Sequence, residues 1–137
     1  MVSEMLHNPL LIMKSARVFG KRILLVDDDP SALESIKLLL SIDRHMITEA
    51  RNGREALEQL AQQRFDLVIL DYFMPGMRGD ELAASLKGTA PGLPILMITD
   101  YLEKLGDSDK PVDAVLAKPF AVDELRETIA KLLGVVG

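Results

Sequence analysis

Polar side chains stand directly after four short apolar runs of this sequence. Each run is four residues long and free of charged residues, which is typical of a strand covered on both faces of a sheet. Parallel strands end at a common edge, where α/β proteins bind their ligands, so we expect these polar groups to gather there. They are Asp27, Asp28 and Asp29 after the first run, Asp71 after the second, Thr99 after the third and Lys118 after the fourth.

This set of residues suits phosphoryl chemistry. Carboxylates placed close together repel one another, and each then has a raised pKa. A divalent cation relieves the repulsion, and a site made only of oxygen ligands selects a hard ion such as Mg²⁺. A carboxylate beside such an ion can act as a nucleophile and carry an aspartyl phosphate. The Thr99 hydroxyl and the Lys118 ammonium are suited to bind the remaining phosphoryl oxygens.

Each residue also has an ordinary structural role when it is taken alone. For Asp29, which precedes Pro30, capping of the next helix is the better interpretation. A threonine at the end of a strand is commonly only a β-former, and a lysine before proline is commonly solvated. Taken together these separate roles explain the pattern poorly, because all of the residues fall on one edge of one sheet.

The composition excludes several other kinds of function. The chain has 137 residues, which suits one domain. It has no cysteine and only two histidines, so thiolate sites, disulfides and histidine-rich zinc centres are excluded. A net charge of -5 argues against sequence-independent nucleic-acid binding. No apolar run has the length of a membrane-spanning helix or a secretory signal, so we expect a cytoplasmic protein without membrane insertion.

Strands and helices alternate along the chain after residue 20. The residues between the predicted strands leave room for crossover helices, so we predict an α/β fold with a doubly wound parallel sheet and helices on both faces. Expected caps are Asp29, Asn52 together with Glu55, and Gly134. The predicted strands are 23–26, 46–50, 67–70, 95–98 and 114–117, and the predicted helices are 30–40, 52–61, 80–87, a short one at 101–105, and 122–133.

Residues 1–20 differ from the rest of the chain. Pro9 interrupts them, and Leu6, Leu10 and Met13 have a spacing that permits a short amphipathic helix. We interpret residues 1–20 as a linker or loosely docked extension in preference to a dimerisation or docking helix, and 21–137 as the domain.

In its motifs the sequence resembles the receiver domains of two-component response regulators. The resemblance runs from about Lys21 to Leu133 and rests on four motifs in order: ILLVDDDP at 23–30, LVILDYFMPGMRG at 67–79, ILMITD at 95–100 and LAKPF at 116–120. It implies a flavodoxin-like strand order 2-1-3-4-5. It also implies a phosphoacceptor signalling domain rather than an enzyme, which takes its phosphoryl group from a histidine kinase or a histidine phosphotransfer protein and switches an interaction with a downstream protein.

The resemblance assigns a role to each matching residue. Asp71 is similar to the phosphoacceptor. Asp27 and Asp28 resemble the acidic pair that holds Mg²⁺, with the backbone carbonyl of Phe73 as a further ligand. Thr99 is similar to the switch hydroxyl and Lys118 to the lysine that pairs with the phosphoryl group, and the Lys118–Pro119 bond is expected to be cis.

Three features depart from the family's pattern. Val115 stands where an aromatic switch residue is usual, so that coupled aromatic rotation is absent or is taken over by Tyr101. Asp100 stands where a small residue is usual, and its carboxylate either repels phosphodonors or serves only to cap a helix. The stretch between Thr99 and Lys118 is a little short, which predicts an abbreviated helix there.

Two other functions remain open. A phosphatase of the haloacid-dehalogenase type would use Asp27 in an Asp-x-Asp motif, but Ser31 and the lack of a late acidic pair argue against it. The second alternative is a degenerate receiver that is never phosphorylated and acts only by binding a partner. No output domain follows Leu133, which predicts a stand-alone receiver or one from a larger protein such as a hybrid kinase.

Overall fold

A sheet of five parallel strands lies at the centre of the structure. The computed structural model describes residues 18–72, 74, 76–100 and 111–134. The strand order is β2-β1-β3-β4-β5, and each neighbouring pair is parallel, so the predicted fold class and strand order are confirmed. The strands are β1 (Arg22–Val26), β2 (Met46–Ala50), β3 (Leu67–Asp71), β4 (Ile95–Thr99) and β5 (Ala114–Ala117).

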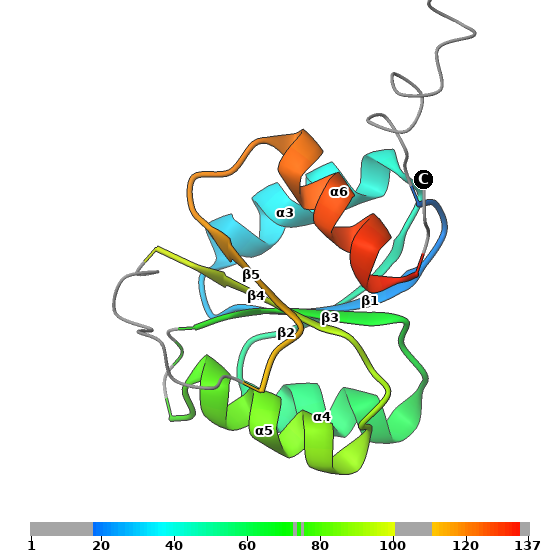
Figure 1. Cartoon of the computed structure of the whole chain (residues 1–137). Coiled ribbons are helices and arrows are strands. Elements are labelled where there is room, and N and C mark those ends of the chain that lie inside the picture. The colour runs from blue at the N-terminus through cyan, green and yellow to red at the C-terminus, as the bar shows by residue number, and fades with distance from the viewer. Residues whose placement is uncertain (1–17, 73, 75, 101–110, 135–137) are drawn as a thin grey trace, which may run out of the picture.

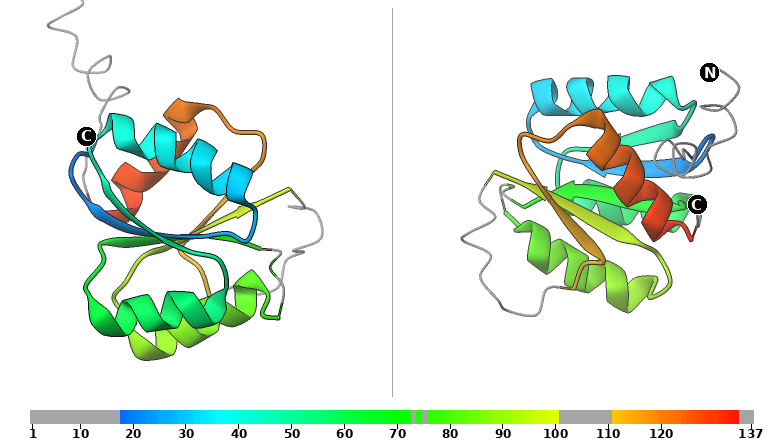
Figure 2. Two further views of the ribbon diagram at one scale, coloured as in Figure 1. Left: turned by 180° about the vertical axis from the view of Figure 1, so that it is seen from behind. Right: turned by 45° about the horizontal axis from the view of Figure 1, so that its top comes forward.

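Helices cover both faces of this sheet. On one face lie α3 (Pro30–Ile42) and α6 (Val122–Leu132), and on the other lie α4 (Gly53–Gln62) and α5 (Gly79–Thr89) (Figure 1). The views from behind and from above show the same three layers (Figure 2). Within the described parts of the chain no helix is long and apolar enough to cross a membrane.

Alternation along the central strands produces two separate apolar cores. In β1, Ile23 and Leu25 pack toward α3 and α6, whereas Leu24 and Val26 pack toward α4 and α5. Successive side chains of a strand point to opposite faces, so an unbroken apolar run is what a sheet with two covered faces requires.

The predicted caps hold two helices in place. The Asp29 carboxylate accepts a hydrogen bond from the Ser31 N–H (3.0 Å) at the start of α3. At the start of α4, the Asn52 side chain accepts from the Glu55 N–H (2.8 Å). The Glu55 carboxylate reaches back one residue further than expected and accepts from the Arg51 N–H (2.9 Å). These bonds satisfy amide groups that have no partner inside a helix.

The ends of several elements differ from their predicted positions. Helix α5 begins at Gly79 and runs through Gly88 to Thr89 instead of ending at Lys87. The Ala90 N–H donates to the Leu86 carbonyl (2.7 Å), which completes a turn that the glycine was expected to end. Strand β3 includes Asp71, strand β4 includes Thr99, and α6 ends at Leu132, with Gly134 in a left-handed conformation (φ 72°) after it. The predicted helix at 101–105 and the N-terminal segment up to residue 17 lie outside the described residues.

A buried ion pair joins the two helices on one face of the sheet. The Arg126 Nε of α6 lies 3.0 Å from the Asp43 carboxylate at the end of α3, and the Asp43 side chain is almost fully buried. Next to it, His45 is buried and its Nδ1 accepts a hydrogen bond from the Lys21 N–H (3.0 Å). Burial lowers the pKa of His45, although the Asp43 charge opposes this effect.

Candidate functional site

Strands β1 and β3 bring two of the predicted aspartates side by side. Val26 of β1 pairs with Leu70 of β3. Asp27 follows Val26 and Asp71 follows Leu70, so both carboxylates lie at the same edge of the sheet. Asp27 is buried, and its Oδ1 accepts a hydrogen bond from the Asp29 N–H (2.9 Å). That bond fixes the direction of the Asp27 carboxylate.

Strands β4 and β5 add the hydroxyl and the lysine to this edge. Asp71 pairs with Ile98, the neighbour of Thr99. The Lys118 N–H donates to the Thr99 carbonyl (2.9 Å), which extends the pairing of β4 with β5 by one step. Thr99 is fully buried. The bond between Lys118 and Pro119 is cis, as predicted.

Three carboxylates form a cluster at this edge. Asp27, Asp28 and Asp71 each offer an oxygen, and these oxygens lie within 4.8 Å of one another. The three residues differ in exposure: Asp27 is buried, Asp71 is half-buried and Asp28 is exposed. Asp29, in contrast, serves as the cap of α3, as predicted. An oxygen-only group of this kind fits a hard divalent cation.

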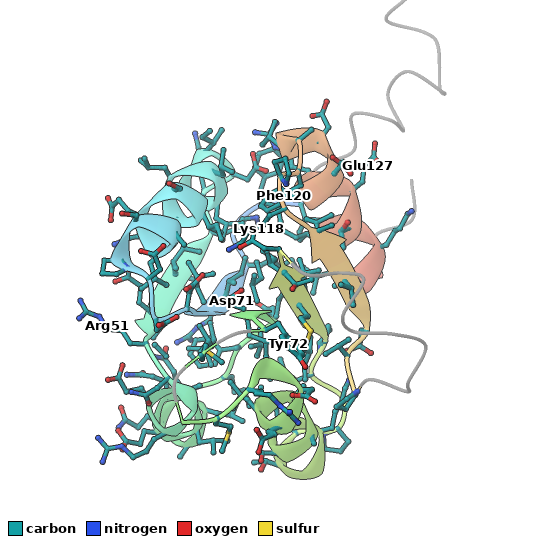
Figure 3. All side chains as sticks on the ribbon, turned by 90° about the vertical axis from the view of Figure 1, so that its left-hand side faces the viewer. Arg51, Asp71, Tyr72, Lys118, Phe120 and Glu127 are labelled. Atoms are coloured by element: carbon teal, nitrogen blue, oxygen red, sulfur yellow. The ribbon has the colours of Figure 1, made fainter. Side chains whose placement is uncertain are left out.

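Lys118 provides a positive charge at the cluster. Its Nζ lies 3.9 Å from Asp71 Oδ1, and both side chains are largely shielded from solvent. Figure 3, which views the edge where the strands end, shows Asp71 and Lys118 near the centre of the molecule, whereas Arg51 points outward at its rim.

Burial and like charges act together on the pKa values of the carboxyls. Burial raises the pKa of Asp71 to about 6, the negative charge of Asp27 adds to the increase, and Lys118 opposes it. Burial also raises the pKa of Asp27, against the hydrogen bond from Asp29 and the charge of Lys118. A carboxyl with a raised pKa is one whose ionised form is poorly stabilised where it lies. A bound cation would remove much of this cost.

Gly79 belongs to the site and was not singled out from the sequence. A Cβ at this position would lie 2.6 Å from the Asp71 carbonyl oxygen and 2.8 Å from the Tyr72 Cα, so that only glycine fits. The Gly79 N–H also donates to the Tyr72 carbonyl (2.7 Å). The signal in the sequence is the glycine that ends the motif at 67–79, but its contact depends on how α5 packs against the end of β3.

A groove runs beside the cluster, between α3 and the segment after β5. It has a volume of about 420 Å³. Apolar side chains predominate in its lining, with Lys118 and Asp100 as the charged members. Asp100 is exposed and adds a negative charge to the lining of this groove. The other lining residues that matter here are Ala32, Ile36, Leu39 and Phe120.

Two of the residues that were singled out cannot be placed. Phe73, the predicted source of a carbonyl ligand, and Tyr101, the possible mobile aromatic, lie outside the described residues. Val115 is half-buried and packs against the core on the side of α4 and α5.

Comparisons with known proteins agree with this geometry. The family model described as the response regulator receiver domain matches residues 23–130. A response regulator MprA of Mycolicibacterium vanbaalenii is 40% identical over 115 residues, which is 82% of this chain and 50% of that protein. The MprA protein of Mycobacterium tuberculosis strain H37Rv is 39% identical over the same length. The chain thus spans about half the length of these curated relatives.

Solved structures lead to the same family. The response regulator TrrA of Thermotoga maritima, crystallised in complex with Mg²⁺-BeF, is 38% identical with a TM-score of 0.78, and the match covers 82% of this chain and 99% of that one. The receiver domain of a sensor histidine kinase of Pseudomonas aeruginosa PAO1, with a magnesium ion in its active-site cleft, is 26% identical with a TM-score of 0.75. That match covers 84% of this chain and 98% of that one.

Proposed function

Because the chain belongs to the family of response regulator receiver domains, we propose that it accepts a phosphoryl group on Asp71 and thereby switches an interaction with a downstream protein. The donor is a histidine kinase or a histidine phosphotransfer protein. The observation that carries the proposal is the meeting of three carboxylates and Lys118 at one edge of the sheet.

Asp27, Asp28 and Asp71 are the residues that would hold Mg²⁺. The family resemblance adds the backbone carbonyl of Phe73 as a further proposed ligand. The oxygen-only donor set fits this ion, and two structurally similar receivers were crystallised with magnesium. When bound, Mg²⁺ supplies positive charge that offsets the repulsion among the carboxylates and the charge of a phosphoryl group.

Asp71 acts as the nucleophile. One of its carboxylate oxygens forms a bond to phosphorus while the bond between phosphorus and the donor's imidazole nitrogen breaks, and that nitrogen keeps the electron pair and takes up a proton. Lys118 is close enough to follow the negative charge as it moves onto the phosphoryl oxygens. Thr99, at the end of the neighbouring strand β4, supplies a hydroxyl to the same group.

The groove beside the cluster is the proposed docking place of the donor. Its apolar lining suits a helix with apolar side chains, and Lys118, which lines the groove and lies 3.9 Å from Asp71, marks where the phosphorylated histidine would enter. The curated relatives are about twice as long as this match, so the downstream target of this chain follows from no comparison with them.

Phosphorylation with a small phosphodonor tests the proposal directly. Intact mass measured after incubation with acetyl phosphate and Mg²⁺ is expected to show one phosphoryl adduct on the wild-type protein and none on Asp71→Asn. Asp29→Asn is the matched control, because Asn caps the helix as well as Asp does, and it is expected to keep the adduct. An adduct on Asp71→Asn would refute the assignment, and continuous release of phosphate from many esters would point to a phosphatase instead.

A further inference from the structure

Three exposed apolar side chains lie around the C-terminal end of α3. Among the described residues, four large apolar side chains are more than half exposed: Phe19 (54%), Leu38 (63%), Ile42 (58%) and Met46 (57%). Single exposed apolar residues are common, but a group of them at one place on a surface indicates that something binds there. We call Phe19, Leu38 and Ile42 the α3 patch; Met46 is left out, because it shares a strand face with Ala50, on the side of α4 and α5.

Backbone hydrogen bonds bring the members of the α3 patch to one corner of the molecule. Leu38 and Ile42 are four residues apart on α3 and therefore share one face of the helix. The Gly20 N–H donates to the carbonyl of Asp43 (3.1 Å), which places Phe19 beside the end of this helix.

The start of β2 shows at which end of the sheet this corner lies. The Met46 N–H donates to the Lys21 carbonyl (2.8 Å), so the first residue of β2 lies against the segment that leads into β1. This corner is at the end of the sheet opposite to the carboxylate cluster, because Met46 begins its strand and Ala50 ends it next to Asp27.

The chain itself offers an occupant for the patch. Val18 is buried in the core, so the chain enters the domain beside the patch, and 17 residues precede it. They include a concentrated set of large apolar side chains. Four residues lie between Met13 and Val18, and four extended residues span up to about 14 Å, which is enough to reach α3. The apolar residues in question are Leu6, Leu10, Leu11, Ile12 and Met13.

We propose that residues 6–13 dock on the α3 patch of the same chain. A segment tethered so close to its site has an effective concentration in the millimolar range, whereas a second copy of the protein is present at micromolar concentration in most preparations. The tether therefore favours the chain's own segment over a second copy. The docked segment covers a side of α3 that adjoins the groove beside Asp71, because Leu38 and Ile42 each lie three residues after a groove-lining residue, Ser35 and Leu39.

Disulfide trapping tests this proposal, and the absence of cysteine makes the chain suitable for it. Lys14→Cys is combined with Ser41→Cys, which is exposed on α3 next to Ile42. The control combines Lys14→Cys with Lys131→Cys, an exposed position on α6. The C-terminal ends of α3 and α6 both lie at the end of the molecule where the chain enters (Figures 1 and 2), so a free segment would reach both.

Under a mild oxidant and at low protein concentration, we expect the Lys14→Cys/Ser41→Cys pair to form an intramolecular disulfide at least tenfold faster than the control pair. Adding Leu38→Ser and Ile42→Ser to the first pair is expected to remove this advantage. Both changes are at exposed positions, so the fold should survive, and circular dichroism checks this.

Two outcomes would overturn the proposal. Equal rates for the two pairs would mean that the segment does not select the patch. A disulfide-linked dimer as the main product would mean that a second copy covers the patch instead. Hydrogen exchange gives an independent readout, because docking predicts that Leu38→Ser/Ile42→Ser lowers the protection of the amides of residues 10–13, and unchanged protection would contradict docking.

Discussion

Lys118 Nζ lies 3.9 Å from Asp71 Oδ1, within reach of charge attraction but too far for a direct hydrogen bond. The lysine thus lowers the energy of the ionised Asp71 without occupying a hydrogen-bonding position on its oxygen. This arrangement leaves the raised pKa of Asp71 only partly compensated, and it has a measurable effect on stability.

The first prediction concerns pH. The pKa of Asp71 is raised to about 6 in the fold, from 3.8 when unfolded, so the folded state holds the proton more tightly. The contribution of Asp71 to the free energy of unfolding is therefore greatest below pH 4 and is lost as the pH rises through 6. In chelator, the stability of Asp71→Asn should increase relative to that of wild type over this range, by roughly 3 kcal/mol at pH 7. Urea unfolding at pH 4, 5, 6 and 7 measures the difference, with Glu127→Gln as an exposed control. A difference that is independent of pH would contradict the raised pKa.

The second prediction concerns the metal. Asp28→Asn removes one of three crowded charges together with an exposed ligand, so this variant should melt higher than wild type in chelator. Mg²⁺ at ten times its dissociation constant should stabilise wild type by about 1.4 kcal/mol, a shift of a few degrees, and should stabilise the variant far less. Thermal melts of both proteins with chelator and with Mg²⁺ test this. No shift of wild type at millimolar Mg²⁺ would contradict binding of the ion by these aspartates.

The third prediction concerns Gly79. Gly79→Ala forces a Cβ against the backbone of Asp71 and Tyr72, so we expect a loss of about 1–3 kcal/mol in stability together with slower phosphorylation. Gly88→Ala, in the same helix with open space around it, should instead stabilise by about 0.5–1 kcal/mol and leave phosphorylation unchanged. Equal effects of the two substitutions would show that the close approach at Gly79 is unimportant.

The fourth prediction concerns His45. Burial lowers its pKa below 6.5, so the folded state resists protonation, and the stability it contributes is present above pH 6.5 and falls as the pH drops below that value. Protonation would also put a hydrogen on the Nδ1 that accepts from Lys21. The stability advantage of wild type over His45→Asn should therefore shrink between pH 7.5 and pH 5. His7→Gln, which removes the other histidine, should follow wild type at every pH; a constant gap for His45→Asn would refute the assignment.

The fifth prediction concerns Asp100. The proposed Mg²⁺ and Lys118 would together balance the three clustered carboxylates, so that Asp100 would give the mouth of the groove a net negative charge. Asp100→Asn should speed phosphorylation by acetyl phosphate, a dianion, about two- to fivefold at low salt. The gain should be smaller with phosphoramidate, which carries less negative charge, and should fade at high salt. An equal increase in the phosphorylation rate with both donors would mean that the charge of Asp100 is not the cause of the effect.

The positions of the strands and of the acidic residues were predictable because they depend on local pattern. An unbroken run such as Ile23–Val26 identifies a buried strand, and chain direction then places Asp27 at its carboxyl end. The cap at Asp29 was predictable for the same reason, since the interacting groups are only two residues apart.

Features that depend on packing between distant segments were not predictable. The ion pair between Asp43 and Arg126 joins residues 83 positions apart, and no spacing in the sequence indicates it. The need for glycine at residue 79 follows from how closely α5 approaches β3. Helix α5 continues past Gly88 because its last turn is bonded to Leu86, a contact that outweighs the weak helix propensity of glycine.

Lys118, the positively charged residue of the site, directly follows β5, a strand at the edge of the sheet. Strand β5 is the shortest, lies at the edge of the sheet and pairs with β4 on one side. Edge strands of this kind unfold locally more often than central strands. The attraction between Lys118 and the clustered carboxylates opposes such local unfolding of β5. If Mg²⁺ binds as proposed and neutralises the carboxylates, this attraction weakens. The amide protons of β5 should then exchange faster relative to those of β1, even though the protein as a whole has become more stable.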